Sequence, residues 1–172
     1  MDIRKITSLI FLGLITCNAE NLAGKVISIN DGDTLSVLTK DNTQYKIRLN
    51  HIDAPESKQS FGSKSKQNLS NYVFGKNIIV DYKNKDRYGR ILGTIIYQGN
   101  NINLMQVKDG FAWHYKQYSN AKEYILAEQE ARKLKKGLWT ENNPIEPWAF
   151  RKEKRQWNVF LVLIAEKSYT EI

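Results

Sequence analysis

The sequence has almost no cysteine, few histidines and no long apolar segment near its start. Among its 172 residues, Cys17 is the one cysteine and two residues are histidines. The apolar stretch at residues 6–16 is shorter than the roughly 20 residues that a membrane-spanning helix needs. If Cys17 is removed with the segment that contains it, the mature chain has neither disulfide bonds nor thiol chemistry.

The first 19 residues have the pattern of a secretory signal peptide. The basic residues Arg4 and Lys5 precede the apolar stretch, and small residues ending at Ala19 favour cleavage before Glu20. We therefore expect a secreted or periplasmic protein. Two alternatives stay open at this point: lipid attachment at Cys17, and a membrane anchor that is never removed.

The composition predicts one globular domain with a basic surface. A chain of 172 residues can bury a substantial core, and 41% hydrophobic with 26% charged residues is typical of folded proteins. The 26 basic and 18 acidic residues give a net charge of +8, and removal of residues 1–19 leaves +7. This excess favours polyanionic partners, but it does not distinguish nucleic acid from an anionic membrane surface.

Hydrophobic periodicity predicts short strands with helices between and after them. Period-two alternation at residues 24–49 is typical of half-buried strands, with a polar turn at 40–43. We expect further strands at 77–82 and 91–97, a charged turn at 83–87, and helices at 61–74, 103–109 and from 119 or 120 to 136. In the last helix we expect Ala121, Ile125, Ala131 and Leu134 to face inward. Five short strands with inserted and C-terminal helices fit an OB-fold barrel, a mainly β fold of the α+β class.

Acidic residues and an arginine gather in the stretch from Asp31 to Glu56. Asp31 and Asp33 lie at one end, Asp53 and Glu56 lie at the other, and Arg48 precedes the second pair. Hard divalent cations bind carboxylates, carbonyls and water, and arginine is the side chain best suited to a phosphate. The stretch therefore contains the groups for metal-assisted attack on a phosphodiester. The alternative interpretation is an Asp-Gly turn with solvated charges at strand edges.

Two motifs in this chain resemble those of the thermonuclease (staphylococcal nuclease) family. The first is Asp31-Gly32-Asp33-Thr34 followed by Arg48 and Asp53-Ala54-Pro55-Glu56, and the second is the block at residues 86–95, Asp-Arg-Tyr-Gly-Arg-Ile-Leu-Gly-Thr-Ile. The resemblance covers residues from about 25 to 139. It implies an OB-fold nuclease domain at 20–140. After Trp139 the sequence changes character, and we expect a C-terminal extension at 141–172 that packs on the domain or flanks it, with Trp148 as a candidate for packing back onto the domain.

The resemblance also implies functional residues. They are Asp33, Asp53 and the backbone carbonyl of Ala54 as ligands of one Ca²⁺; Arg48, Glu56 and Arg90 as catalytic residues; and Arg87, Tyr88 and Tyr115 as substrate-binding residues. Glu56 would activate the attacking water, and the two catalytic arginines would hold the scissile phosphate. Tyr115 would stack on a base, although the aromatic residues around it are also compatible with a core.

The implied site requires a bend that strand periodicity does not provide. Alternation alone places Arg48 and Asp53 on opposite faces, five residues apart. We expect Pro55 to contribute to the bend, because proline keeps Ala54 out of the helical region and supplies no hydrogen-bond donor.

Two other assignments fail on the residues present. An EF-hand loop beginning at Asp31 would have Leu35 at a ligand position and Asn42 in place of the closing glutamate. The His114-x-Lys116 pair resembles phospholipase D-type nucleases, but Ala121 stands where that family needs an aspartate.

The expected function is that of a Ca²⁺-dependent endonuclease that hydrolyses DNA and RNA with low sequence specificity and leaves 3′-phosphate ends. We expect a monomer without stable membrane association once the signal is removed. The alternative, from a different class, is a non-catalytic nucleic-acid-binding OB-fold module. The complete set of acids and arginines favours the enzyme.

Overall fold

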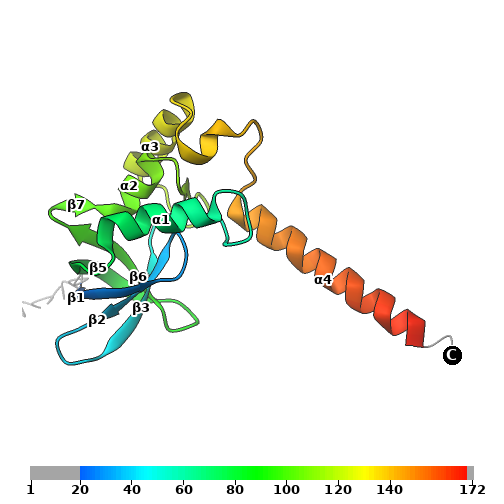
Figure 1. Ribbon diagram of the computed structural model, residues 1–172, viewed down its shortest axis with the longest axis horizontal. Helices are drawn as coiled ribbons and strands as arrows, with labels where there is room; N and C mark the ends of the chain where they lie inside the picture. The colour runs from blue at the N-terminus through cyan, green and yellow to red at the C-terminus, as the bar shows by residue number, and fades with distance from the viewer. Residues whose placement is uncertain (1–19, 170–172) are drawn as a thin grey trace, which may run out of the picture.

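The computed structural model of the protein describes residues 20–169, and its centre is a closed barrel of five strands (Figure 1). Antiparallel pairing runs in the order β3-β2-β1-β5-β6, and parallel pairing of β3 with β6 closes the barrel. The predicted OB-fold is confirmed. The expected signal segment, residues 1–19, lies outside the described residues. The barrel strands are β1 (Glu20–Ile29), β2 (Thr34–Leu38), β3 (Gln44–Leu49), β5 (Asn77–Lys85) and β6 (Ile91–Tyr97).

Two register irregularities allow the sheet to close. In β1 the register shifts between Val26 and Ser28, so the first half of the strand pairs with β5 and the second half with β2. A second shift lies in β5 between Tyr82 and Asn84. An extra residue bends a strand and increases its twist, which is what barrel closure needs. The expected turn at 83–87 is partly wrong, because β5 continues to Lys85.

The barrel interior holds the apolar residues that alternation in β2 and β3 indicated. In β1 the expected apolar face of Ile27 and Ile29 is partly wrong: Val26 is buried and Ile27 is exposed, because the register shifts between Val26 and Ser28. Val26, Leu35, Val37, Ile47 and Val80 are fully buried. Burial of such a side chain contributes about 1.5–3 kcal/mol relative to leaving it exposed, so these positions contribute most of the barrel's stability.

Helices gather on one side of the barrel (Figure 1). The helix α1 begins and ends within one residue of the expected 61–74, and it buries Leu69 and Val73 against the barrel. The remaining elements before the C-terminal helix are β4 (Ile52–Asp53), α1 (Gly62–Val73), β7 (Asn100–Asn101), α2 (Ile102–Lys108), β8 (Trp113–His114), α3 (Lys122–Lys133) and the 3₁₀ helix η1 (Gly137–Thr140).

The predicted inward face of α3 is partly wrong. Ala131 is buried as expected, but Ile125 and Leu134 are exposed, whereas Tyr124 is buried. The helix begins at Lys122, with Ala121 in the N-cap position and no side-chain cap. The face that contacts the barrel is therefore set by packing against α2 and β8 rather than by the positions of the largest aliphatic residues.

The C-terminal extension is dominated by one helix, α4 (Pro147–Tyr169). Its first turns lie beside the domain, and the rest points away from the barrel (Figure 1). Trp157 and Phe160, on the outer part, are exposed. Within residues 20–169, none of the helices combines the length and apolarity that crossing a bilayer requires.

Candidate active site

The loop between β1 and β2 carries Asp31 and Asp33, and Gly32 lets it lie close to α1. A Cβ atom at Gly32 would come within 1.8 Å of the Ser65 hydroxyl and 2.7 Å of the Ala54 methyl carbon. Any side chain there would therefore push the loop off the helix. Gln106 donates a hydrogen bond of 2.7 Å to the carbonyl of Gly32. These contacts fix the direction in which the two aspartates point.

The bend between Arg48 and Asp53 is made at Asn50 and His51. His51 has a φ of 67°, which lies in the left-handed region that most residues avoid. Asn103 holds the turn by donating a hydrogen bond of 3.1 Å to the carbonyl of Asn50. The expectation that Pro55 contributes to the bend is wrong, because the chain has already turned before β4 begins at Ile52.

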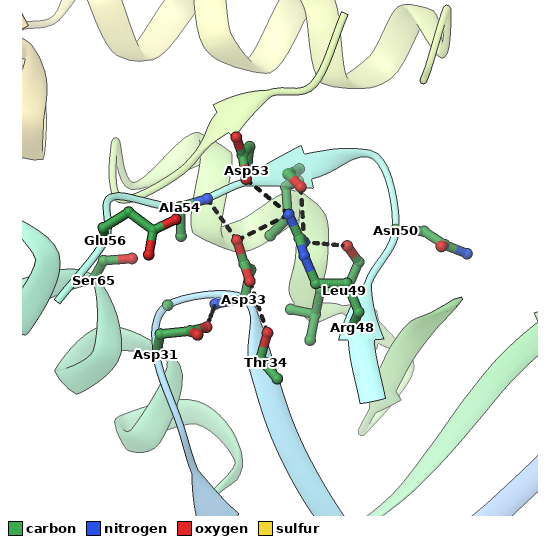
Figure 2. A network of polar contacts seen from close by, with 12 residues as sticks. Asp31, Asp33, Thr34, Arg48, Leu49, Asn50, Asp53, Ala54, Glu56 and Ser65 are labelled. Carbon is green, nitrogen blue, oxygen red and sulfur yellow. Dashed lines mark hydrogen bonds and ion pairs between the residues drawn. The ribbon is translucent and has the colours of Figure 1, made fainter. Parts of the chain in front are cut away.

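The guanidinium of Arg48 joins the two aspartates (Figure 2). Its Nη2 lies 3.2 Å from Asp33 Oδ2 and 2.8 Å from Asp53 Oδ1. Its Nη1 donates to the carbonyls of Leu49 and Ile52, at 2.8 and 2.9 Å. Four acceptors surround one nearly buried guanidinium, so its position is fixed and the two carboxylates are held side by side.

Asp33 and Asp31 accept further hydrogen bonds from neighbouring donors. Asp33 Oδ2 accepts a hydrogen bond of 2.7 Å from the Ala54 amide, and its Oδ1 accepts one from the Thr34 hydroxyl. Asp31 Oδ1 accepts a bond of 3.0 Å from the Asp33 amide. Figure 2 shows these acids and Glu56 gathered around Ala54, with Asn50 pointing away.

Crowding of acids changes their affinity for protons. Burial, together with the negative charge of Asp33, raises the pKa of Asp31 to about 6. Burial also raises the pKa of Asp53, and the charge of Asp33 adds to this effect, although hydrogen bonds from arginine oppose it. Negative charge at this site is therefore only partly compensated by the neighbouring guanidinium groups.

A second guanidinium enters the site from the C-terminal helix. Arg151 Nη2 lies 2.8 Å from Asp53 Oδ2, and its Nη1 lies 3.2 Å from Asp53 Oδ1 and 2.8 Å from Glu56 Oε1. Burial alone would lower the pKa of Arg151, but the hydrogen bonds to Asp53 and Glu56 outweigh it and raise the pKa further. Glu56 thus belongs to the same cluster as the aspartates, through Arg151.

The residues from the second motif lie in the turn between β5 and β6. Arg90 Nε pairs with Asp86 Oδ2 at 2.7 Å, and Arg87 donates to the Tyr88 hydroxyl at 2.7 Å. Both guanidinium groups also lie against the Tyr88 ring, which is largely exposed. Among the described residues, Arg90 has no ion pair with Asp33, Asp53 or Glu56, so its role at the phosphate stays a prediction.

Tyr115 lies at the edge of the cluster in a stack of aromatic rings. Its ring is nearly parallel to that of Trp148, with centroids 5.4 Å apart, and the Tyr118 ring is tilted against it with centroids 4.7 Å apart. Burial raises the pKa of Tyr115, and the charge of Asp53 adds to this effect. Trp113 and His114 are buried in the core, whereas Tyr118 is exposed. Tyr115 therefore lies near the acids, with one face covered by Trp148.

A hard cation fits the donors that this site offers. Among residues 20–169, no three His, Cys, Asp or Glu side chains are arranged to hold a metal ion. Asp33 and Asp53 nevertheless lie close enough to share one guanidinium nitrogen, and the Ala54 backbone lies between them. Two carboxylates, a carbonyl and water suit Ca²⁺ better than metals that require nitrogen or sulfur ligands.

Comparison with known proteins agrees with this fold. Residues 46–141 match the model of a family described as "Staphylococcal nuclease homologue". A Haemophilus influenzae protein named "Uncharacterized endonuclease" is 49% identical over 147 residues, which cover 86% of this chain and 83% of that protein. A Shigella flexneri protein named "Micrococcal nuclease" is 40% identical over 143 residues, covering 77% of this chain and 82% of that protein. The Escherichia coli "Protein ParB" is 41% identical over 143 residues, covering 77% of this chain and 80% of that protein.

These findings identify the class of protein: the chain belongs to the family of staphylococcal nuclease homologues. The resemblance found from the two sequence motifs is thereby confirmed.

The sequence reasoning missed Arg151 entirely. It is 98 residues from Asp53 in the chain, and no motif includes it. One signal was present: Trp148 was a candidate for packing back onto the domain, and a residue three positions later lies on the same face of a helix. Arg151 therefore follows Trp148 toward the site once α4 forms.

Proposed function

We propose that this protein is a Ca²⁺-dependent nuclease that hydrolyses DNA and RNA and leaves 3′-phosphate ends. The observation that carries the proposal is the cluster of Asp33, Arg48 and Asp53, with Glu56 at its edge. Membership of the staphylococcal nuclease homologues and the endonuclease names of relatives support phosphodiester hydrolysis. The choice of Ca²⁺ and the side of cleavage rest on the family resemblance and on the oxygen-rich donor set.

Asp33, Asp53 and the carbonyl of Ala54 would hold the cation. When bound, Ca²⁺ would supply Lewis-acid polarisation of the phosphate. The chain itself keeps both carboxylates adjacent through Arg48, whose guanidinium offsets their mutual repulsion.

Glu56 would orient the attacking water and accept its proton. An ordinary glutamate is a weak base at neutral pH, but a positioned carboxylate still accelerates proton transfer in the transition state. Arg48 and Arg90 would stabilise the negative charge that develops on the phosphate oxygens. Arg90 can do this only when its ion pair with Asp86 is broken. In that pair, Arg90 Nε lies 2.7 Å from Asp86 Oδ2.

Low sequence specificity follows from the type of contact. Arg87, Tyr88 and Tyr115 would bind phosphates and base faces, which every nucleotide offers, rather than base edges. The mature charge excess of +7 adds sequence-independent attraction to the polyanion.

A Ca²⁺ titration of nuclease activity tests the metal assignment. Asp33→Asn removes one of two ligand charges, so the half-saturating Ca²⁺ concentration should rise by at least ~10-fold, with part of the activity restored at high Ca²⁺. The matched control is Asp81→Asn, which removes the same charge from an exposed position on β5 and should leave the titration unchanged. Purified protein that binds DNA but never cleaves it in Ca²⁺ would instead indicate a non-catalytic binding module.

We also propose export through a cleaved signal peptide, with a mature N-terminus at Glu20. Support comes from the sequence of residues 1–19, in which Arg4 and Lys5 precede the apolar stretch at 6–16 and small residues end at Ala19. N-terminal sequencing of the exported protein should therefore begin at Glu20. An intact Met1 in the cytoplasmic fraction would contradict export, and a lipid-modified Cys17 would show that the protein is a lipoprotein.

A further inference from the structure

We propose that Arg151 is a built-in competitor of the cation, so that helix α4 acts as a latch on the active site. This inference rests on the proposed function, because it concerns the same carboxylates. The Arg151 guanidinium contacts both oxygens of Asp53 and one oxygen of Glu56, all within 3.2 Å. One positively charged group therefore pairs with both the proposed metal ligand, Asp53, and the proposed base, Glu56.

The competition follows from the small number of oxygens available. The Asp53 side chain is 1% exposed, so it has no freedom to turn toward a second partner. Its Oδ1 already accepts from Arg48, and its Oδ2 accepts from Arg151. A cation that binds Asp53 must approach through an oxygen that Arg151 uses. Cation binding and the docked position of Arg151 therefore exclude each other.

Of the two arginines at Asp53, Arg151 is the one that can leave. The Arg48 side chain is 12% exposed and is held by Asp33 and two backbone carbonyls as well. The Arg151 side chain is 36% exposed, and its ion pairs in the described structure are with the two acids. Because Arg151 is the more exposed of the two arginines and no backbone carbonyl holds it in the described structure, it is the one that a divalent cation can displace.

Release of Arg151 need not release the whole helix. Trp148, one turn earlier on α4, stacks on Tyr115 and lies edge-on to Trp113 at 5.9 Å. The helix thus has an anchor independent of the acids. The released guanidinium would stay close to the site, while Glu56 would become free to accept a proton from water. Through this exchange, α4 would set the cation concentration at which the site becomes competent.

The test compares Arg151→Gln with Lys152→Gln in the full mature chain. Lys152 is the next residue on α4 and is exposed, so its substitution removes the same charge without a contact to the acids. Isothermal titration calorimetry with Ca²⁺ alone, at physiological ionic strength, measures binding without nucleic acid or turnover. We expect Arg151→Gln to bind Ca²⁺ roughly 5- to 50-fold more tightly than wild type, a usual size for coupling between two ligands. Lys152→Gln should match wild type, because salt screens its distant charge.

A second measurement follows the helix itself. Hydrogen exchange of residues 151–157, which follow the Trp148 anchor, should become faster on Ca²⁺ addition in wild type and should not respond to Ca²⁺ in Arg151→Gln. Thermal unfolding of both variants confirms that they are folded. Equal or weaker Ca²⁺ binding by Arg151→Gln, with wild type binding normally, would overturn the latch but leave the proposed function intact. Absence of Ca²⁺ binding in every variant would overturn the metal assignment and the latch together.

Discussion

Glu56→Gln should abolish most nuclease turnover while leaving the fold intact. The substitution preserves the shape of the side chain and a hydrogen-bond acceptor for Arg151, but the amide cannot take a proton from water. General-base assistance contributes ~10²–10⁴-fold, so the cleavage rate should fall by at least ~10²-fold. The Glu56 side chain is 39% exposed, and its loss should therefore have little effect on stability.

The measurement is the cleavage rate at saturating Ca²⁺, together with Ca²⁺ and DNA binding and circular dichroism. Glu130→Gln is the matched control, because Glu130 is exposed on α3 and away from the acids. Binding should be retained by both variants, and activity should be lost in Glu56→Gln alone. A wild-type rate in Glu56→Gln would remove this residue from the mechanism.

Arg48→Lys should be nearly as damaging as complete loss of the side chain. The guanidinium uses two nitrogens in different directions, one for Asp33 and Asp53 and one for the carbonyls of Leu49 and Ile52. An ammonium presents its donors from a single atom and cannot satisfy both sets. Loss of one preorganised donor at a developing charge lowers a rate by ~10²–10³-fold, and we expect a loss of this size.

Stability should fall as well, because Arg48 offsets the repulsion between two nearly buried carboxylates. Leaving a buried charge without its partner costs about 3–5 kcal/mol, and the lysine variant should approach the lower end of that range. Chemical denaturation measures this change, and rates are compared under conditions in which the variant is folded. Arg155→Lys, at an exposed position on α4, is the control and should match wild type in both assays. Full activity in Arg48→Lys would show that a simple positive charge suffices at this position.

Local patterns determined much of the fold. Strand alternation placed Leu35, Val37, Ile47 and Leu49 inside the barrel, because side chains on a strand point alternately to its two faces. It did not place Val26 there, because the register of β1 shifts between Val26 and Ser28. The helix at 61–74 was predictable for a similar reason: its apolar residues recur on one helical face, and Gly75 ends it with a φ of 72°. The order of acids and arginines in two motifs was enough to establish the family.

The position of the bend could not be read from the sequence. Histidine adopts a left-handed φ more often than most residues, but only rarely. His51 adopts it because Asn103 and the neighbouring strand hold the turn. The inward face of α3 was likewise decided by its neighbours. Tyr124 is buried because its hydroxyl finds Asn101 and its ring packs on His51, whereas the more apolar Ile125 stays exposed.

The sequence by itself determined the order of the charged residues that the fold brings together, with Asp33 directly before β2, Arg48 on β3 and Asp53 on β4. Only the tertiary structure decided what faces them. Arg151 reaches Asp53 across 98 residues of chain because Trp148 stacks on Tyr115 and directs the first turns of α4 toward the acids. Contacts of that kind depend on how elements pack in space, and no spacing along the chain specifies them.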